Sequence, residues 1–320
     1  MILFIAPYDG SPPENSPFIA AAKKIRIILN ILKSIDEHLI LLNSFPRNKS
    51  ITKNKFDSIN IGGEISITRY TPELKQVNWV GRMVNLYQIS IIVEDIVKRY
   101  GIPDYIWIYN GYAFECRVAE FCKKSFNSKI ILEFEDWHFA RKRGFNPKPF
   151  IDWFFWRKAS KYIDFGFCVN NFLAQKLSAK GIKTLLLPGI LNNKYFKELN
   201  LRTPFTNNEM ITVGYFGGLF KEKGAQFILD LIDHNNLIPV RFIICGTGDY
   251  EDKFRGKAIR NPRKITFLTR LSEAELINQY KEVDIILNPH VINNGIFPFK
   301  IIEALFFKKL VISSKLELEG

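Results

Sequence analysis

The sequence predicts an α/β protein with parallel sheets that is divided into two domains. Short apolar runs that suit buried strands alternate with amphipathic helical patterns along the chain, and this alternation is typical of parallel sheets covered by helices. The length of 320 residues favours two domains. A polar stretch from Pro188 to Asn208 precedes a new apolar run at Ile211–Phe216, which is typical of a boundary. We therefore predict a first domain over residues 1–190 and a second over residues 206–320.

The elements of the first domain follow from the spacing of its apolar residues. Apolar residues recur at helical spacing within Phe18–Ser34, which predicts a helix with one buried face. For residues 43–78, a polar segment with a turn signal at Gly62-Gly63, we expect only short strands and loops. The other predicted helices are Trp79–Tyr100, Ala113–Ser125 and Phe150–Lys161. The predicted strands are Ile2–Ala6, His38–Leu42, Asp104–Tyr109, Lys129–Phe134 and Gly166–Val169.

The second domain repeats this alternation of apolar runs and helical patterns. Its predicted strands are Ile211–Phe216, Val240–Cys245, Ile265–Leu268, Ile285–Asn288 and Val311–Ser313. Its predicted helices are Phe227–Asp233, Glu273–Lys281 and Ile301–Phe306.

Composition narrows the class of protein. No apolar run reaches membrane-spanning length, and the opening Met1–Pro7 lacks the basic region of a signal peptide, so we expect a cytoplasmic protein. The four cysteines fit no zinc or redox spacing and are expected to be free, buried thiols. None of the four histidines pairs with another at metal-ligand spacing.

The net charge of +13 is concentrated in the first domain. Residues 1–190 contain 27 basic against 17 acidic side chains, and residues 191–320 contain 18 against 15. A basic surface suits nucleic acid, an anionic membrane or an anionic substrate. Nucleic acid is the weakest of these, because no helix-turn-helix, zinc-finger or RNA-recognition signature is present.

A glycine-rich turn follows the strand Ile211–Phe216. Gly217 and Gly218 let the backbone approach a ligand closely, and the helix that follows directs N–H groups at an anion. Lys223 adds a point charge suited to a diphosphate. A plain strand-to-helix turn with solvated lysines is an equally good interpretation of the local pattern.

The stretch Phe297–Leu305 is the most informative part of the chain. A loop precedes a short helix whose N-terminus suits a phosphate. Glu303, on this helix, can accept hydrogen bonds from two neighbouring sugar hydroxyls, so the pair of features suggests a nucleotide-sugar. The alternative is an ordinary amphipathic helix with one solvated glutamate.

Polar groups also follow the strand Lys129–Phe134. Glu135 and Asp136 stand side by side at its end, with His138 close behind. We interpret Asp136 or His138 as a group that contacts a substrate. A histidine that is hydrogen-bonded into local structure is the alternative.

In their order and spacing, the segments of the second half resemble glycosyltransferase family 4. The resemblance covers residues 100–320, with Lys223-Gly224, the Gly246-Thr247-Gly248 turn, Tyr280–Pro289 and Glu303 as landmarks. It implies the GT-B fold, in which two Rossmann-like domains face a cleft, and sugar transfer from a nucleotide-sugar with retention at the anomeric carbon. It implies no metal and no cofactor, and the chain has no Asp-x-Asp motif.

The resemblance also assigns roles to single residues. Asp136 or His138 would be catalytic groups that contact the sugar or the acceptor. The implied donor-binding residues are Gly217, Gly218, Lys223, Gly246, Gly248, Leu271, Gly295, Lys300 and Glu303.

The sequence departs from the family pattern in three places. Gly218 stands where the family has an arginine, and Gly295 stands where it has a first glutamate, with Asn294 as the nearest polar residue. We hypothesise that Lys300 replaces part of the missing positive charge. Because the family pattern continues beyond the strand at Val311, we expect an incomplete second domain.

Two functions are therefore considered. The first is a glycosyltransferase that acts on a saccharide or lipid-linked acceptor in cell-surface polysaccharide or lipopolysaccharide assembly. The second is a non-catalytic donor-binding or partner subunit. A segment rich in aromatic and basic residues, Phe145–Phe167, suits the surface of an anionic membrane and a peripheral location, although core packing is the better explanation for most of its rings.

Overall fold

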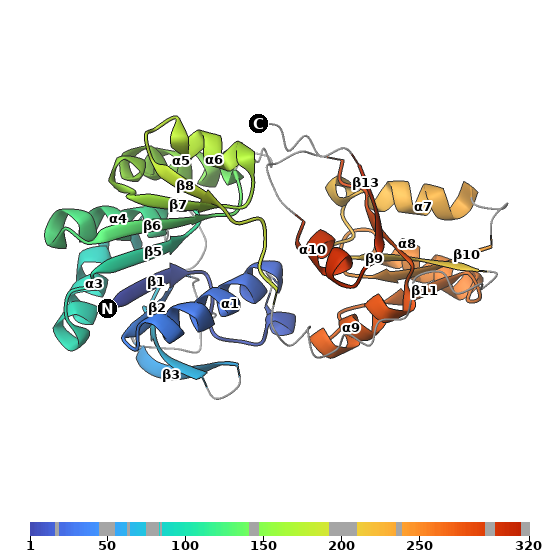
Figure 1. The fold of residues 1–320 in the computed structure, drawn as a ribbon, viewed down its shortest axis with the longest axis horizontal. Coiled ribbons are helices and arrows are strands. Elements are labelled where there is room, and N and C mark those ends of the chain that lie inside the picture. Colours follow the sequence, from blue (N-terminus) through green and yellow to red (C-terminus); the bar gives the residue numbers. More distant parts are fainter. Residues whose placement is uncertain are drawn as a thin grey trace. The chain divides into compact units, whose positions relative to one another are not determined.

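The structure is a computed structural model that describes residues 1–16, 19–44, 55–62, 65–74, 83, 85–140, 147–191, 210–234, 239–291 and 298–314. It confirms the mixed α/β class. Contacts divide the chain into two compact units, unit 1 up to Ile190 and unit 2 from Leu191 onward (Figure 1). Each unit is built on one sheet and is described separately below.

Unit 1 contains an eight-stranded sheet with the order β3-β4-β2-β1-β5-β6-β7-β8. All neighbours pair in parallel except β3 and β4, which are antiparallel. The strands are β1 Ile2–Ala6, β2 Leu39–Asn43, β3 Lys55–Gly62, β4 Ile65–Thr71, β5 Tyr105–Tyr109, β6 Lys129–Phe134, β7 Phe165–Cys168 and β8 Lys183–Leu186. The helices are α1 Ile19–Ile35, α3 Ile89–Tyr100, α4 Ala113–Phe126, α5 Lys148–Ala159 and α6 Asn171–Ser178, with short 3₁₀ turns at Pro13–Asn15, His138–Ala140 and Ser160–Tyr162.

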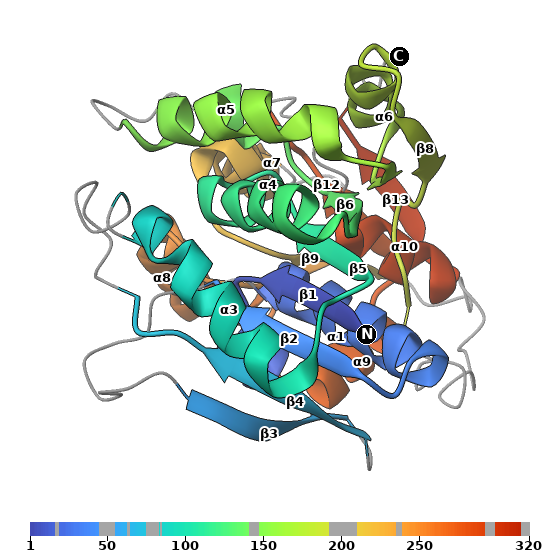
Figure 2. The same cartoon turned by 90° about the vertical axis from the view of Figure 1, so that its left-hand side faces the viewer.

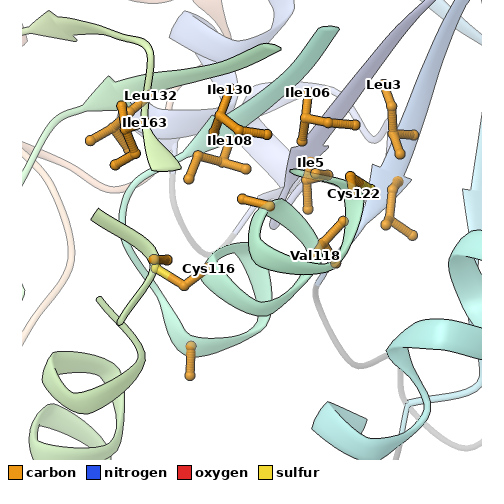
Figure 3. Close-up of a cluster of buried hydrophobic side chains, with 14 of the residues drawn as sticks. Leu3, Ile5, Ile106, Ile108, Cys116, Val118, Cys122, Ile130, Leu132 and Ile163 are labelled. Carbon is orange, nitrogen blue, oxygen red and sulfur yellow. The ribbon is translucent and has the colours of Figure 1, made fainter. Parts of the chain in front are cut away.

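The core of unit 1 lies on both faces of its sheet. Leu3 and Ile5 of β1 join a cluster with Cys116 of α4, while Ile2 and Phe4 of the same strand pack with helix α1 on the other face. Figure 3 shows side chains of β1, β5 and β6 meeting those of α4. Burial on both faces explains why these strands are continuous apolar runs.

Unit 2 contains a five-stranded, wholly parallel sheet with the order β11-β10-β9-β12-β13. The chain extends the sheet outward from β9 on one side and then returns to add β12 on the other. The strands are β9 Ile211–Phe216, β10 Val240–Cys245, β11 Ile265–Leu268, β12 Ile285–Asn288 and β13 Leu310–Ser313. The helices are α7 Ala225–His234, α8 Glu251–Arg260, α9 Glu273–Glu282 and α10 Phe299–Phe306, with a 3₁₀ turn at Lys221–Lys223.

Most predicted elements are confirmed, and four strands have the predicted bounds in unit 2. Three elements were not predicted: β8, α6 and α8. Helix α8 buries only Phe254, so its sequence has little apolar periodicity. Strand β8 is an edge strand with mostly exposed side chains. Of the helix predicted at Trp79–Tyr100, α3 confirms the second half, and part of the first half lies outside the described residues.

Two predictions from composition can be checked in the structure. The four cysteines, Cys116, Cys122, Cys168 and Cys245, are free and buried, as predicted. Across the described ranges, no helix is both long enough and apolar enough to cross a membrane.

Candidate functional site

The candidate site of unit 2 lies where the direction of chain progression in the sheet reverses. Strands β9 and β12 are neighbours, and the loops after their carboxyl ends are the turn Gly217–Gly224 and the segment Pro289–Val291. In open parallel sheets, ligands bind outside the carboxyl ends of the strands at such a switch point. The two loops contact each other, since the Val291 amide donates to the Glu222 carbonyl at 3.1 Å.

Basic side chains gather at this switch point. Lys300, in the first turn of α10, places its Nζ atom 4.1 Å from the centre of the Tyr215 ring. The Tyr215 hydroxyl donates to the Gly218 carbonyl at 2.7 Å and lies 3.4 Å from the Lys223 carbonyl oxygen, so one tyrosine contacts both Lys300 and the turn. The same Nζ atom is 3.7 Å from the position that a Cβ atom on Gly217 would occupy.

The pKa shifts of these groups show that they influence one another. Burial and the charge of Lys223 lower the pKa of Lys300 to about 7. Burial together with Lys223 and Lys300 lowers the pKa of His290 to about 3, so this histidine is neutral at physiological pH. The charges acting on both groups are positive. We call Lys223, Lys300 and the neutral His290 the lysine cluster, an arrangement that would be stabilised by a bound anion.

Glycine is required at two points of the surrounding loops. Gly224 has a φ of +79°, and a Cβ atom there would lie 1.8 Å from the Pro289 carbonyl oxygen. Gly246 packs so closely that a Cβ atom would lie 1.9 Å from the Gly217 carbonyl oxygen. These approaches hold the turn after β9 against the loops after β12 and β10. Gly248 similarly approaches the backbone of Leu219.

Glu303 is buried on α10 and accepts a hydrogen bond of 2.9 Å from the Tyr280 hydroxyl of α9. Tyr280 therefore fixes the orientation of this carboxylate. Leu271 is partly buried against the core cluster that includes Phe216 and Cys245. Gly295 lies outside the described residues.

The predicted catalytic residues lie in unit 1, at the end of β6. Asp136 and His138 are both buried, and the Asp136 amide donates to the Asn110 side chain at 3.2 Å. The His138 Nδ1 atom lies 3.2 Å from the Asp136 carbonyl oxygen, and its ring packs on Tyr112 and Phe139. These local contacts are those expected from the alternative interpretation of His138, and a catalytic role stays a prediction.

Two buried carboxylates lie near the start of α4, and one of them is close to His138. Asp152 of α5 accepts a 3.0 Å bond from the Ala113 amide at the start of α4, and its other oxygen lies 3.8 Å from His138 Nε2. Lys148 also contacts that oxygen. Glu115, which accepts a bond from Ser44, has its pKa raised to about 7 by burial.

A second buried cluster in unit 1 was not predicted. Lys24 of α1 contacts Glu135 and lies 2.8 Å from Glu133, at the end of β6. We call these three residues the charge triad. Burial would lower the pKa of Lys24, but the two carboxylates overcome this effect and raise it. Burial raises the pKa of Glu133, whose side chain is 0% exposed.

Sequence reasoning therefore missed His290, Tyr215 and the partners of Glu135. His290 directly follows Asn288-Pro289 at a strand end, and the rule that ligands bind at carboxyl ends could have identified it. Lys24 carries no comparable signal, because it lies 111 residues before Glu135. Among the residues that the structure describes, no group of three or more His, Cys, Asp or Glu side chains is arranged to hold a metal ion.

Comparisons with known proteins place this geometry in a class. Residues 211–319 match the sequence model of a family described as glycosyl transferases group 1. The matched range contains every strand and helix described for unit 2. Over 99 residues it is 31% identical to glycogen synthase of Caldicellulosiruptor saccharolyticus, a match that covers 30% of this chain and only 20% of that enzyme.

Solved structures show the fold of the whole chain. Sucrose-phosphate synthase from Thermosynechococcus elongatus superimposes with a TM-score of 0.69 at 14% identity, over 98% of this chain and 81% of that one. The lipopolysaccharide outer core galactosyltransferase WaaB superimposes with a TM-score of 0.62 at 15% identity, over 100% of this chain and 81% of that one. The fold is therefore that of the GT-B glycosyltransferases, as predicted.

Proposed function

We propose that this protein is a glycosyltransferase that transfers a sugar from a nucleotide-sugar to a saccharide or lipid-linked acceptor, with retention at the anomeric carbon. The single observation that supports this most strongly is the lysine cluster at the β9–β12 switch point, within the domain matched by the family. A diphosphate carries the opposite charge, and its binding would relieve the repulsion between Lys223 and Lys300.

The same geometry suggests how the chain would assist the reaction. As the bond between the sugar and the diphosphate breaks, negative charge grows on the departing phosphate. Lys223 and Lys300 would stabilise that charge from fixed positions, which is the most effective form of electrostatic catalysis. Lys300 would thereby supply part of the positive charge that is missing because Gly218 stands where the family has an arginine. Glu303, oriented by Tyr280, would hold the ribose hydroxyls. Asp136 or His138 would contact the sugar or the acceptor.

Cell-surface polysaccharide or lipopolysaccharide assembly is the proposed setting, with the protein at the inner face of the membrane. The structural similarity to a lipopolysaccharide galactosyltransferase supports this choice of acceptor class. We propose that neither a metal nor a cofactor is needed.

Isothermal titration of the purified protein with UDP, GDP and ADP tests the donor site. We expect one nucleotide to bind in the micromolar range and to bind more weakly to Lys300→Ala and Glu303→Ala. Tyr280→Phe is the matched control for Glu303, because it removes the same 2.9 Å hydrogen bond and keeps the carboxylate. We expect Tyr280→Phe to weaken binding less than Glu303→Ala does, and unchanged binding by Glu303→Ala would show that the carboxylate has no direct role. No binding of any nucleotide would refute the donor site.

A non-catalytic donor-binding subunit is the second candidate, favoured by glycine at both positions 218 and 295. An activity assay distinguishes the two candidate functions. The protein is incubated with a crude lipid-linked acceptor fraction and with a nucleotide-sugar that contains the nucleotide found to bind. Release of free nucleotide that depends on the acceptor supports the enzyme. Tight nucleotide binding without turnover supports the subunit.

A further inference from the structure

Helix α5 of unit 1 presents an unusual face to solvent. Its exposed positions follow the period of a helix and continue into the 3₁₀ turn that ends it. They are Phe150, Trp153, Phe154, Arg157, Lys158 and Lys161. We call these six residues the α5 face. On an ordinary surface helix this stripe is polar, whereas here one half is aromatic and the other half is basic.

The aromatic half is well exposed. Phe150 is 67% exposed, Trp153 39% and Phe154 41%, and the rings of Phe150 and Trp153 lie 6.0 Å apart. The opposite side of the helix, with Asp152 and Trp156, packs within the unit, where α5 runs beside α4 (Figure 2). The exposed rings are therefore not needed for the core, and covering them would remove apolar surface from water.

The basic half adjoins these rings directly. Arg157 lies over the ring of Trp153 with its guanidinium carbon 5.5 Å from the ring centre, and the Lys158 ammonium lies 4.2 Å from that of Phe154. The only acidic residue within α5 is Asp152, which is buried and bound by Lys148 and the Ala113 amide. The face is thus apolar and cationic with no acidic member.

We propose that the α5 face docks on an anionic phospholipid surface, with its rings among the acyl chains and its cations on lipid phosphates. Amphipathic helices that lie in the membrane interface combine aromatic rings with lysine and arginine in this way, and each cation near an anionic leaflet strengthens binding about fivefold. A second copy of the chain fits less well, because the same three cations would face one another. The proposal deepens the proposed function, since a lipid-linked acceptor lies at such a surface.

Vesicle flotation of the full chain tests the proposal without any nucleotide, so it can fail independently of the donor site. We expect binding to phosphatidylcholine vesicles that contain phosphatidylglycerol and little binding to phosphatidylcholine alone. Added salt should weaken binding. Reversing the three cations in Arg157→Glu/Lys158→Glu/Lys161→Glu should weaken binding roughly a hundredfold or more. Trp153→Ser/Phe154→Ser should weaken it at every salt concentration.

The control changes the same kind of residue on another helix. Lys253 and Arg255 of α8 in unit 2 also stack on rings, those of Tyr250 and Phe267. Lys253→Glu/Arg255→Glu should leave vesicle binding within twofold of the original. Circular dichroism and urea denaturation check that every variant is folded.

Three results would overturn the proposal. The first is equal binding to both kinds of vesicle or to neither. The second is a loss of binding in the α8 control as large as in the α5 variant. The third is unchanged vesicle binding by both α5 variants, which would indicate that the rings and cations contact a protein partner and not lipid.

Discussion

One lysine of each unit, Lys24 and Lys300, lies largely out of solvent, and the two are used in opposite ways. In unit 1, Lys24 lies between Glu133 and Glu135, and their charges raise its pKa. In unit 2, Lys300 stacks on Tyr215, and burial together with the charge of Lys223 lowers its pKa to about 7. The first lysine has its counter-charges within the fold, so it serves structure. The second is acted on by like charge, so we infer that its counter-charge comes from a ligand.

The largest effect should follow from removing Lys24. Lys24→Met leaves the buried Glu133 and the partly buried Glu135 without their cation, and we expect the free energy of unfolding to fall by about 3–5 kcal/mol. Urea denaturation measures this change. Lys24→Met/Glu133→Gln/Glu135→Gln, which neutralises all three, should recover most of the loss. Equal instability of the two variants would show that packing of the Lys24 chain, and not charge, is what matters.

Removing Lys300 should act in the opposite direction on stability. Lys300→Ala relieves repulsion by Lys223, so we expect the free energy of unfolding to stay the same or rise by about 1 kcal/mol. Affinity for the nucleoside diphosphate should fall roughly 10- to 100-fold, since a charge-assisted hydrogen bond contributes about 1.5–3 kcal/mol. Denaturation and titration of one preparation give both numbers. A marked loss of stability would mean that Lys300, like Lys24, stabilises the fold.

Lys300 also gives the donor site a pH dependence. Its pKa of about 7 lies below the ordinary value for lysine, so the group loses its proton as the pH rises through 7. A bound diphosphate favours the charged form, so binding above pH 7 should take up a proton, and affinity should fall by up to about tenfold per pH unit. Below pH 7 the lysine is already charged and the dependence should vanish.

Calorimetry in buffers of different ionisation enthalpy measures this proton uptake. The work is best done above pH 7, where the terminal phosphate of the nucleotide, with a pKa of about 6, is already ionised. Lys300→Arg keeps the charge at every pH, so it should bind without taking up protons. Equal proton uptake by the arginine variant would mean that another group titrates.

The sequence predicted the scaffold of both units better than their charged clusters. Strands such as Lys129–Phe134 and Val240–Cys245 have the predicted bounds because both of their faces are buried, which leaves a continuous apolar run. Helix α8 was missed because a helix that buries one phenylalanine has almost no pattern. The local sequence pattern therefore identifies an element when many of its side chains are buried, and it fails when few are.

The candidate site was predictable only in part for a different reason. Lys223, Lys300 and Glu303 lie in segments with a recognisable family order, so they could be named individually. The approach of Lys300 to Tyr215, and of the His290 segment to the turn after β9, depends on the return of the chain from β11 to β12 beside β9. Likewise, Lys24 meets Glu133 only because α1 packs close to the end of β6. Such contacts are set by the topology of the chain, so no local sequence pattern predicts them.

The smallest effect should come from an exposed ion pair, which separates the contribution of burial from that of pairing. Arg255 and Glu251 of α8 lie 2.8 Å apart one helical turn from each other, with side chains that are 50% and 29% exposed. We expect Glu251→Gln to change the free energy of unfolding by less than about 0.5 kcal/mol, because water screens the pair and already solvates each charge. The same urea titration measures it. A cost close to that of Lys24→Met would mean that pairing alone stabilises this protein, and the contrast between the two units would no longer follow from burial.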